Sequence, residues 1–266
     1  MRLPDRMTLA FTVAGAMLVA YTVAALLVIA IPELTSLSHL LSVAAEPDVI
    51  SSILLTFAAG FVAVAILALL GTPLAYQLAR TDFRGKALVE SLIDIPLILP
   101  HTVAGLMVYL LFMARGPIGG LFAPAGIFFE EAFLGIVVAM VFVSTPYYVN
   151  TVREGFSRVP VQLEHVARTL GARRFRAFTA VTLPLSQGHL ISGATMAWGR
   201  AVGEFAAVIM IAYFPMVVST LIYQRFSTGG LAESRSVAFL MVIVAFLIFL
   251  LIRWAAGSRR RRDDHP

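Results

Sequence analysis

The sequence contains no cysteine, and few of its 266 residues are charged. Without cysteine, the chain has no disulfide bond, thiolate nucleophile or thiolate metal ligand. Charged residues make up 13% of the chain and hydrophobic residues 59%. A soluble domain would not confine so few charges to isolated clusters, so this composition indicates a membrane protein. The net charge of +5 does not predict a nucleic-acid partner, because the basic residues alternate with apolar runs, as charges that set membrane orientation do.

The short motifs of common enzymes are also missing. No G-x-x-x-x-G-K-[ST] occurs, so the sequence has no P-loop for binding ATP. The motifs H-E-x-x-H and G-x-S-x-G are absent too, as is any cluster of His, Asp and Glu in the sequence. These absences argue against a membrane enzyme and predict neither a catalytic residue, nor a metal site, nor a cofactor in this chain.

Six apolar runs are long enough to cross a bilayer, which takes about 20 residues. They cover residues 8–31, 50–79, 91–114, 132–152, 185–212 and 236–254. The first run is longer than the roughly 7–15 apolar residues of a cleaved signal peptide, so we interpret it as a retained helix closed by Pro32. Gly71 and Pro73 predict a kink or a broken end in the second run. We therefore expect an all-α integral membrane protein with a single transmembrane domain over residues 1–266.

Lys and Arg are distributed unevenly between the two sides of the expected membrane. With the N-terminus inside, 16 of the 20 lie in inner segments. These are Arg2, Arg6, Arg80, Arg84, Lys86, Arg153, Arg158, Arg168, Arg173, Arg174, Arg176, Arg253 and the arginines at 259–262. The outer loops hold Arg115, Arg225 and Arg235. This bias predicts six spans with both termini in the cytoplasm, because an odd number of spans would scramble it.

The longest charged interruption is the segment from Val159 to Pro184, here called the elbow: VPVQLEHVARTLGARRFRAFTAVTLP. Pro160 suits the first position of a helix, and Gly171 suits a left-handed residue at its end. One apolar face is predicted at i, i+3, i+4 and i+7, namely Leu163, Val166, Ala167 and Leu170. Such a helix suits a groove on a partner protein. The alternative is an amphipathic helix lying on anionic lipid.

Charged residues flank this apolar face. Glu164 and Arg168 are spaced to pair at i, i+4. Arg173, Arg174 and Arg176 begin a second, basic helix, and Pro184 is expected to stop it.

The elbow resembles the cytoplasmic EAA signature of ABC-transporter permease subunits of type I importers. That pattern is EAA, three residues, Gly, nine residues, then a β-branched residue, one residue and Leu-Pro. Gly171 is followed by nine residues and then by Val181-Thr182-Leu183-Pro184, and Ala167 matches the second Ala. His165 stands where the family usually has Glu, and Glu164 precedes it, where the family often has an acid as well.

Further motifs extend the resemblance to roughly residues 50–252. GTPLAYQLAR, IDIPLILPHTVAG and GRAVGEFAAVIMI are similar to the molybdate/tungstate branch of these permeases, close to sulfate permeases. The resemblance implies a permease core over residues 50–254, after a first helix over residues 8–31. It also implies a coupling loop over residues 153–184, with the coupling helix between the fourth and fifth spans. The implied coupling residues are Glu164, His165, Ala167, Arg168, Gly171, Leu183 and Pro184.

The implied assembly is a homodimer of this subunit in the cell membrane, with two ATP-binding-cassette ATPases that use ATP and Mg. An external substrate-binding protein would deliver the oxyanion, which we expect to be molybdate or tungstate. Sulfate or thiosulfate is the first alternative. A secondary transporter is the second, although many of those contain internal repeats, and we find none in this sequence.

Polar residues interrupt the third and fifth runs. Arg200 and Glu204 would each cost roughly 2.5–3.5 kcal/mol as lone charges at mid-membrane, so we expect them to pair. The pair either lines a gate or ties helices together. Pro100, His101 and Thr102 occupy an irregular part of the third run. They either line the pathway or form a kink whose polar groups are satisfied by neighbouring helices.

Overall fold

The computed structural model describes residues 5–263, except for the side chains of residue 6 and residues 253–263. Arg2 and the side chains of Arg6, Arg253 and the arginines at 259–262, which enter the orientation count, therefore lie outside the described part. The described chain is all-helical, as expected, and contains no strand.

The helices up to the middle of the chain match the first three expected runs only in part. They are α1 (Arg6–Thr35), α2 (Leu37–Ala44), α3 (Pro47–Ile66), α4 (Thr72–Arg80), α5 (Lys86–Ile98), α6 (His101–Phe112) and α7 (Gly119–Phe122). Pro32 does not close the first helix, because α1 continues through it to Thr35. The stretch that follows forms the short helix α2.

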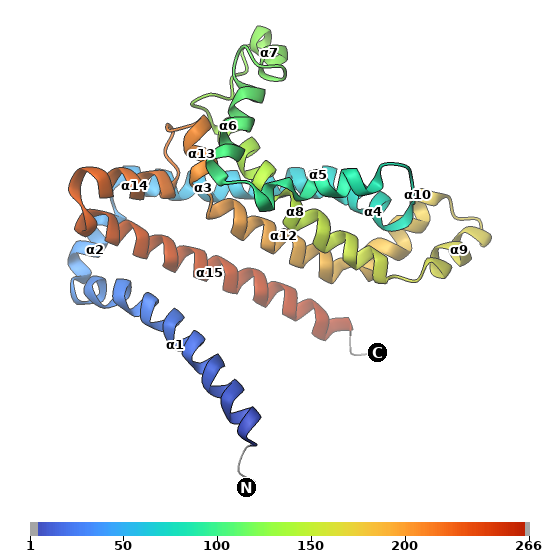
Figure 1. Ribbon diagram of the computed structural model, residues 1–266, viewed down its shortest axis with the longest axis horizontal. Helices are drawn as coiled ribbons and strands as arrows, with labels where there is room; N and C mark the ends of the chain where they lie inside the picture. Colours follow the sequence, from blue (N-terminus) through green and yellow to red (C-terminus); the bar gives the residue numbers. More distant parts are fainter. Residues whose placement is uncertain (1–4, 264–266) are drawn as a thin grey trace.

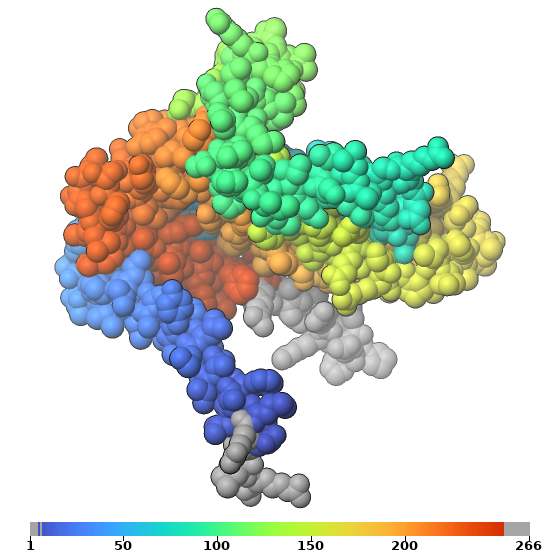
Figure 2. All heavy atoms as spheres, viewed as in Figure 1, coloured from blue at the N-terminus to red at the C-terminus, as the bar shows by residue number. Residues whose placement is uncertain are grey.

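The remaining elements are α8 (Phe133–Arg158), α9 (Val161–Thr169), α10 (Arg174–Ala177), α11 (Leu183–Leu185), α12 (Gln187–Val202), α13 (Ala206–Ile211), α14 (Val218–Gly229) and α15 (Leu231–Asp263). Figure 1 shows α8 inside the body, with α9 at one end of the long axis and α2 and α14 at the other. In the space-filling view, α6 and α7 project sideways from this body (Figure 2).

Four helical stretches in residues 5–263 are long and apolar enough to cross a membrane: Met7–Thr35, Pro47–Arg80, Phe133–Arg158 and Leu231–Ile252. The third expected run becomes a fifth candidate if α5 and α6, bent by 118°, form one broken span. The fifth expected run is not one helix, because it is interrupted between Val202 and Ala206. Six spans therefore remain a prediction.

Two π-helical segments explain how prolines are accommodated in long helices. Leu67–Gly71 precedes Pro73, and Phe178–Thr182 precedes Pro184. Proline has no N–H and clashes with the carbonyl four residues earlier, which in both cases lies in the π segment. The wider π turn relieves this clash, so helical structure continues through each proline. The irregularity near Pro73 is thus a π segment within one helical stretch, whereas the helical structure through Pro184 ends at Leu185, one residue after the expected stop.

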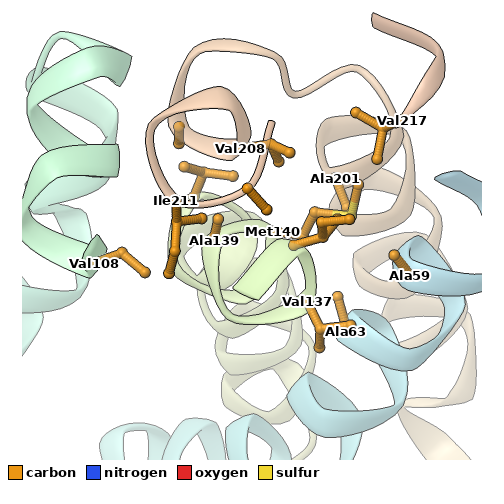
Figure 3. Close-up of a cluster of buried hydrophobic side chains, with 14 of the residues drawn as sticks. Ala59, Ala63, Val108, Val137, Ala139, Met140, Ala201, Val208, Ile211 and Val217 are labelled. Carbon is orange, nitrogen blue, oxygen red and sulfur yellow. The ribbon is translucent and has the colours of Figure 1, made fainter. Parts of the chain in front are cut away.

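Small residues mark where the helices pack. The main core lies between α3, α6, α8, α12 and α13 (Figure 3), and its fully buried members include Ala59, Ala63, Ala104, Ala139, Ala201 and Ala207. Nearly all faces of these helices are apolar, so hydrophobicity alone cannot select the packed face. Small side chains select it, because they let two helix backbones approach closely.

The contact between α6 and α13 is one of these close approaches. A Cβ on Gly105 would lie 2.7 Å from the Cα and 2.8 Å from the carbonyl oxygen of Ala207. This contact holds α6 against α13, although α6 turns away from α5.

The long helix α1 departs from the body, as Figure 1 shows, and its apolar window is fully exposed in the single chain. Its C-terminal end is fixed by Glu33, which is 1% exposed. Arg235 Nε donates to this carboxylate over 2.6 Å, and Ser236 Oγ donates over 2.7 Å. Two residues at the start of α15 thus anchor the end of α1.

Replacing Gly105 with alanine should destabilise the protein. The new methyl group would overlap the Ala207 backbone, and overpacking of this kind costs about 1–3 kcal/mol. Thermal unfolding in detergent would measure the loss. The matched control is Gly15→Ala in α1, where a Cβ meets nothing within 4 Å and the melting temperature should not fall. Equal melting temperatures for the two variants would contradict the close contact.

Candidate functional site

The first half of the elbow folds as the spacing of its residues predicts. Pro160 is the N-cap of α9, and Gly171 follows the helix with φ of 93°. This left-handed conformation favours glycine, since a side chain there is strained. A turn then leads to Arg174, where helical structure resumes and continues through α10, the π segment and α11.

A buried carboxylate joins the elbow to the membrane helices. Glu164 in α9 is 7% exposed. Its Oε2 accepts a hydrogen bond of 2.7 Å from Tyr76 Oη, and its Oε1 accepts one of 2.9 Å from Arg80 Nε. Thr182 Oγ1 also donates to Oε1, over 2.5 Å. We call these four residues the Glu164 network; it connects α9 with the end of α4 and with the π segment before α11.

The network is supported by an aromatic cluster. The ring of Tyr76 lies with its centroid 4.7 Å from that of Phe178 and 5.8 Å from that of Phe156. Phe156 is fully buried near the end of α8. The α9 carboxylate is therefore fixed over a packed junction of three chain segments.

The pKa of Glu164 is lowered by its partners. Burial raises this pKa, but the hydrogen bonds from Thr182 and Tyr76, together with the charge and hydrogen bond of Arg80, outweigh burial and bring the pKa below its ordinary value of 4.5. A carboxyl whose pKa is lowered on folding stabilises the fold above its unfolded pKa. That contribution is lost only as the pH falls through the lower, folded value, so the network is intact at neutral pH.

The expected pair between Glu164 and Arg168 does not form. Glu164 points inward to Arg80, while Arg168 is exposed on α9. An arginine that is also buried, with its side chain 8% exposed, forms a better partner than one held on the helix flank. His165, which occupies the position of the usual family acid, is exposed.

The outward side of the elbow is apolar and basic. Leu163, Val166 and Leu170 are exposed, Leu170 to 83%. Four arginines of the elbow are exposed as well: Arg168, Arg173, Arg174 and Arg176. Glu164 is the one acid between residues 159 and 184, and Arg80 neutralises it. The exposed surface of the elbow is therefore positively charged.

The other predicted coupling residues lie around this junction. Ala167 is half-buried on α9. Leu183 is half-buried and Pro184 is exposed, and both begin α11. Their place directly after the π segment puts them next to Thr182 of the Glu164 network.

The predicted pathway residues of the third and fifth runs come together at a second location. Arg200 Nη2 donates to Glu204 Oε2 and lies 2.8 Å from Nδ1 of His101. We call these three residues the Arg200 cluster. Pro100 is the exposed N-cap of α6, and Thr102 is exposed one residue after His101.

Arg200 and Glu204 pair as expected, but not within one helix. α12 ends at Val202, and Glu204 lies in the break before α13. Its Oε1 accepts a hydrogen bond of 2.7 Å from the backbone N–H of Ala207. The Glu204 carboxylate therefore caps the start of α13 as well as pairing with Arg200.

Sequence reasoning missed three members of the Glu164 network. Tyr76 and Arg80 lie in the GTPLAYQLAR motif, and Arg80 also counts as a positive-inside charge, but neither pattern assigns them a partner. Tyr76, Thr182 and Arg80 lie 88, 18 and 84 positions from Glu164, beyond any helical periodicity. Thr182 lies inside the spacing motif that ends in Leu183-Pro184, so all three residues belong to motifs of the resemblance, which do not indicate what the side chains contact. Within residues 5–263, no group of three or more His, Asp or Glu side chains is placed to hold a metal ion.

Removing the carboxylate of Glu164 should destabilise the elbow junction strongly. Glu164→Ala leaves Arg80 buried without its partner, and breaking a buried pair in this way costs about 3–5 kcal/mol. The melting temperature in detergent should therefore fall. Glu154→Ala is the matched control, because the Glu154–Arg158 pair is exposed and such pairs contribute about 0–1 kcal/mol. A fall of similar size in both variants would contradict the network.

Comparisons with known proteins extend these observations. Residues 71–262 match the family described as Binding-protein-dependent transport system inner membrane component. The chain is 38% identical over 256 residues to the molybdate/tungstate transport system permease protein WtpB of Pyrococcus furiosus, covering 96% of this chain and 98% of that protein. It is 36% identical over 249 residues to the protein of the same name from Thermococcus kodakarensis, covering 94% and 96%.

A more distant relative has a different name. The sulfate transport system permease protein CysT of Synechocystis sp. is 30% identical over 223 residues, covering 82% of this chain and 78% of that protein.

Solved structures share the fold. A bacterial alginate ABC transporter, in complex with an alginate pentasaccharide-bound periplasmic protein, has a chain that matches with a TM-score of 0.67 at 18% identity and 95% coverage of both chains. The MetNI methionine ABC transporter, in inward-facing conformations, matches with a TM-score of 0.61 at 18% identity, covering 80% of this chain and 95% of that chain. At these identities the likeness establishes the fold alone. With the matched family and relatives, it shows that this chain belongs to the binding-protein-dependent transport system inner membrane components, the multi-pass membrane permeases of ABC importers.

Proposed function

We propose that this permease forms the membrane pathway of an ATP-driven importer for molybdate or tungstate, and that the elbow couples this pathway to an ATPase. The observation that carries the coupling is the Glu164 network. It ties the exposed helix α9 both to α4 and to the π segment that leads into α11 and α12. A displacement of the elbow is thereby passed to two membrane segments at once.

The outward face of the elbow supports a protein partner over lipid. In Figure 1, α9 lies at the end of the long axis, farther out than the drawn end of α15. A helix lying in the membrane interface would instead stay level with the ends of the spanning helices. The exposed Leu163, Val166 and Leu170 suit an apolar groove, and His165 and Arg168 beside them supply polar contacts. We assign this groove to the ATPase.

The proposed topology keeps six spans with both termini and the elbow in the cytoplasm. The broken pair α5–α6 forms the third span, and α12 with α13 forms the fifth. The single transmembrane domain covers residues 1–266, with the first helix near 8–31, the permease core at 50–254 and the coupling loop at 153–184. The segregation of Lys and Arg in the sequence supports this arrangement.

The proposed assembly is a homodimer of this subunit with two ATPases and one external binding protein. ATP and Mg are used by the ATPase, since the permease sequence has no P-loop. ATP-driven closure of the ATPases moves both elbows and shifts the pore between inward-facing and outward-facing forms, which requires that the partner bind the two forms with different affinity. The solved alginate transporter, which shares this fold, is described with a bound periplasmic protein.

The choice of oxyanion follows the relatives. Relatives named molybdate/tungstate permeases are 34–38% identical over 81–96% of the chain. Relatives named sulfate permeases are 28–32% identical over 81–85% of the chain. Molybdate or tungstate is therefore the proposed substrate, and sulfate is the second candidate.

Coupling should depend on the left-handed turn of the elbow. Gly171→Ala introduces about 1–2 kcal/mol of backbone strain and should tilt α9, so that transport per ATP hydrolysed falls several-fold. The matched control is Gly85→Ala, because Gly85 has φ of 91° and, like Gly171, offers nothing within 4 Å to a new Cβ. It lies before α5, outside the elbow. Both variants should unfold at similar temperatures. Normal coupling in Gly171→Ala would contradict the role of the elbow.

Substrate and energy source can be tested together in liposomes that contain the purified permease–ATPase complex. The cognate binding protein is added with molybdate, tungstate or sulfate. We expect uptake of molybdate or tungstate only when ATP is present inside the liposomes. Uptake without ATP would indicate a secondary transporter. Faster uptake of sulfate than of both other anions would replace the proposed substrate with the second candidate.

A further inference from the structure

The Arg200 cluster lies where three elements meet. His101 is the first residue of α6, Arg200 is in the last turn of α12, and Glu204 lies between α12 and α13. Figure 1 shows the start of α6 beside α13, away from both ends of the molecule. The cluster therefore occupies the broken middle of two proposed spans, where irregular backbone is tolerated if it lines a cavity or is buried in protein.

The three side chains differ sharply in exposure. The side chain of Glu204 is 2% exposed, that of Arg200 17% and that of His101 47%. The carboxylate thus lies behind the guanidinium, and the imidazole lies at the surface. An anion approaching this surface meets His101 and Arg200 before it meets Glu204.

Arg200 has donors left for a second acceptor. Within the described residues, its hydrogen bonds to His101 and Glu204 all use Nη2. Nε and Nη1 make none there, and neither is among the buried polar atoms without a partner, so solvent reaches them. A guanidinium carries five N–H donors in a fork that matches oxyanions. Nη2 of Arg200 is therefore occupied by Glu204 and His101, whereas Nε and Nη1 are free to donate to an anion from the solvent side.

Given the proposed import of oxyanions, on which this depends, we propose that Arg200 is a transient binding site for the transported oxyanion and that Glu204 competes with the anion for Arg200. Glu204 is fixed by the Ala207 N–H and cannot follow Arg200 away from the α12–α13 break. An arriving anion attracts the Arg200 guanidinium toward the solvent side, and the fixed Glu204 carboxylate attracts it toward the α12–α13 break. Competition of this kind keeps occupancy short, as conduction requires that a site hold an ion weakly enough to release it.

The competition has a measurable size. Close charge pairs have coupling free energies that correspond to about tenfold or more in affinity. In Glu204→Gln the amide oxygen still accepts from Ala207, but the competing charge is gone. The permease–ATPase complex in detergent, without binding protein, should then bind radiolabelled molybdate about tenfold or more tightly. Uptake in liposomes should show a lower KM together with a lower kcat, because release becomes slow.

The matched control is Glu46→Gln. Glu46 also pairs with an arginine, Arg225, but at the start of α3, outside the cluster. It should leave molybdate affinity, KM and kcat unchanged. Equal molybdate affinity in Glu204→Gln and the wild type would overturn the competition.

A purely structural ion pair makes the opposite prediction for the double variant Arg200→Gln/Glu204→Gln. Two neutral, hydrogen-bonding side chains would then restore both the melting temperature and transport. We expect instead that the double variant binds molybdate weakly and that its uptake KM is raised about tenfold, although its melting temperature is close to that of the wild type. Normal uptake by this double variant would overturn the role of Arg200.

A second pair of variants applies if Glu204→Gln does not fold. Arg200→Gln should raise the uptake KM about tenfold, and Arg200→Lys should restore part of it, because lysine keeps the charge but not the fork. Wild-type uptake with ATP tests the proposed function separately. Its absence would contradict oxyanion import, whereas an unchanged KM in Arg200→Gln would contradict only the anion site.

Discussion

Three buried carboxylates hold segments of this chain together that hydrophobic packing alone would leave unspecified. Among the described residues, the buried acidic side chains are Glu33, Glu164 and Glu204, and each is paired with an arginine. A charge in apolar surroundings must find a counter-ion, because its desolvation is not otherwise offset. Each carboxylate therefore determines where a second segment lies: α15 against α1, α4 against α9, and the α12 end against the α13 start.

The Glu164 junction gives the permease a stiff connection between its exposed elbow and its membrane helices. Had Glu164 paired with Arg168 on the surface, the elbow would have been joined to the body through the chain alone. The inward pair adds three side-chain bonds to two further segments. It also leaves the outer face apolar and basic. The Glu164 carboxylate thus makes the junction rigid. Because it is buried, the surface that a partner contacts carries only the positive charges of the elbow.

At the Arg200 cluster, the buried carboxylate is again paired with an arginine, but the arginine is only partly enclosed. Glu204 is fixed by a backbone N–H and is almost fully buried, whereas Arg200 keeps donors toward the open side. A carboxylate placed behind an arginine neutralises it without covering it. This arrangement suits the proposed anion site, and it arises because the breaks in two proposed spans bring His101, Arg200 and Glu204 into contact.

Much of the elbow could be predicted, since its signals are local: the helical spacing of Leu163, Val166 and Leu170, and the glycine at its end. Helical structure passes Pro184 through a π segment and ends at Leu185, one residue after the expected stop. The partners of Glu164 could not be predicted, since Tyr76, Arg80 and Thr182 are distant in sequence and carry no periodic pattern.

The sequence by itself determined that this is a helical membrane protein with a charged elbow, because apolar run length and Lys/Arg distribution report directly on the bilayer. It also determined the family resemblance, through the fixed spacing from Gly171 to Pro184. Only the tertiary structure decided which faces pack and which charges meet. Apolar side chains cover all sides of these helices, so close approach at small residues and pairing of buried charges make that choice.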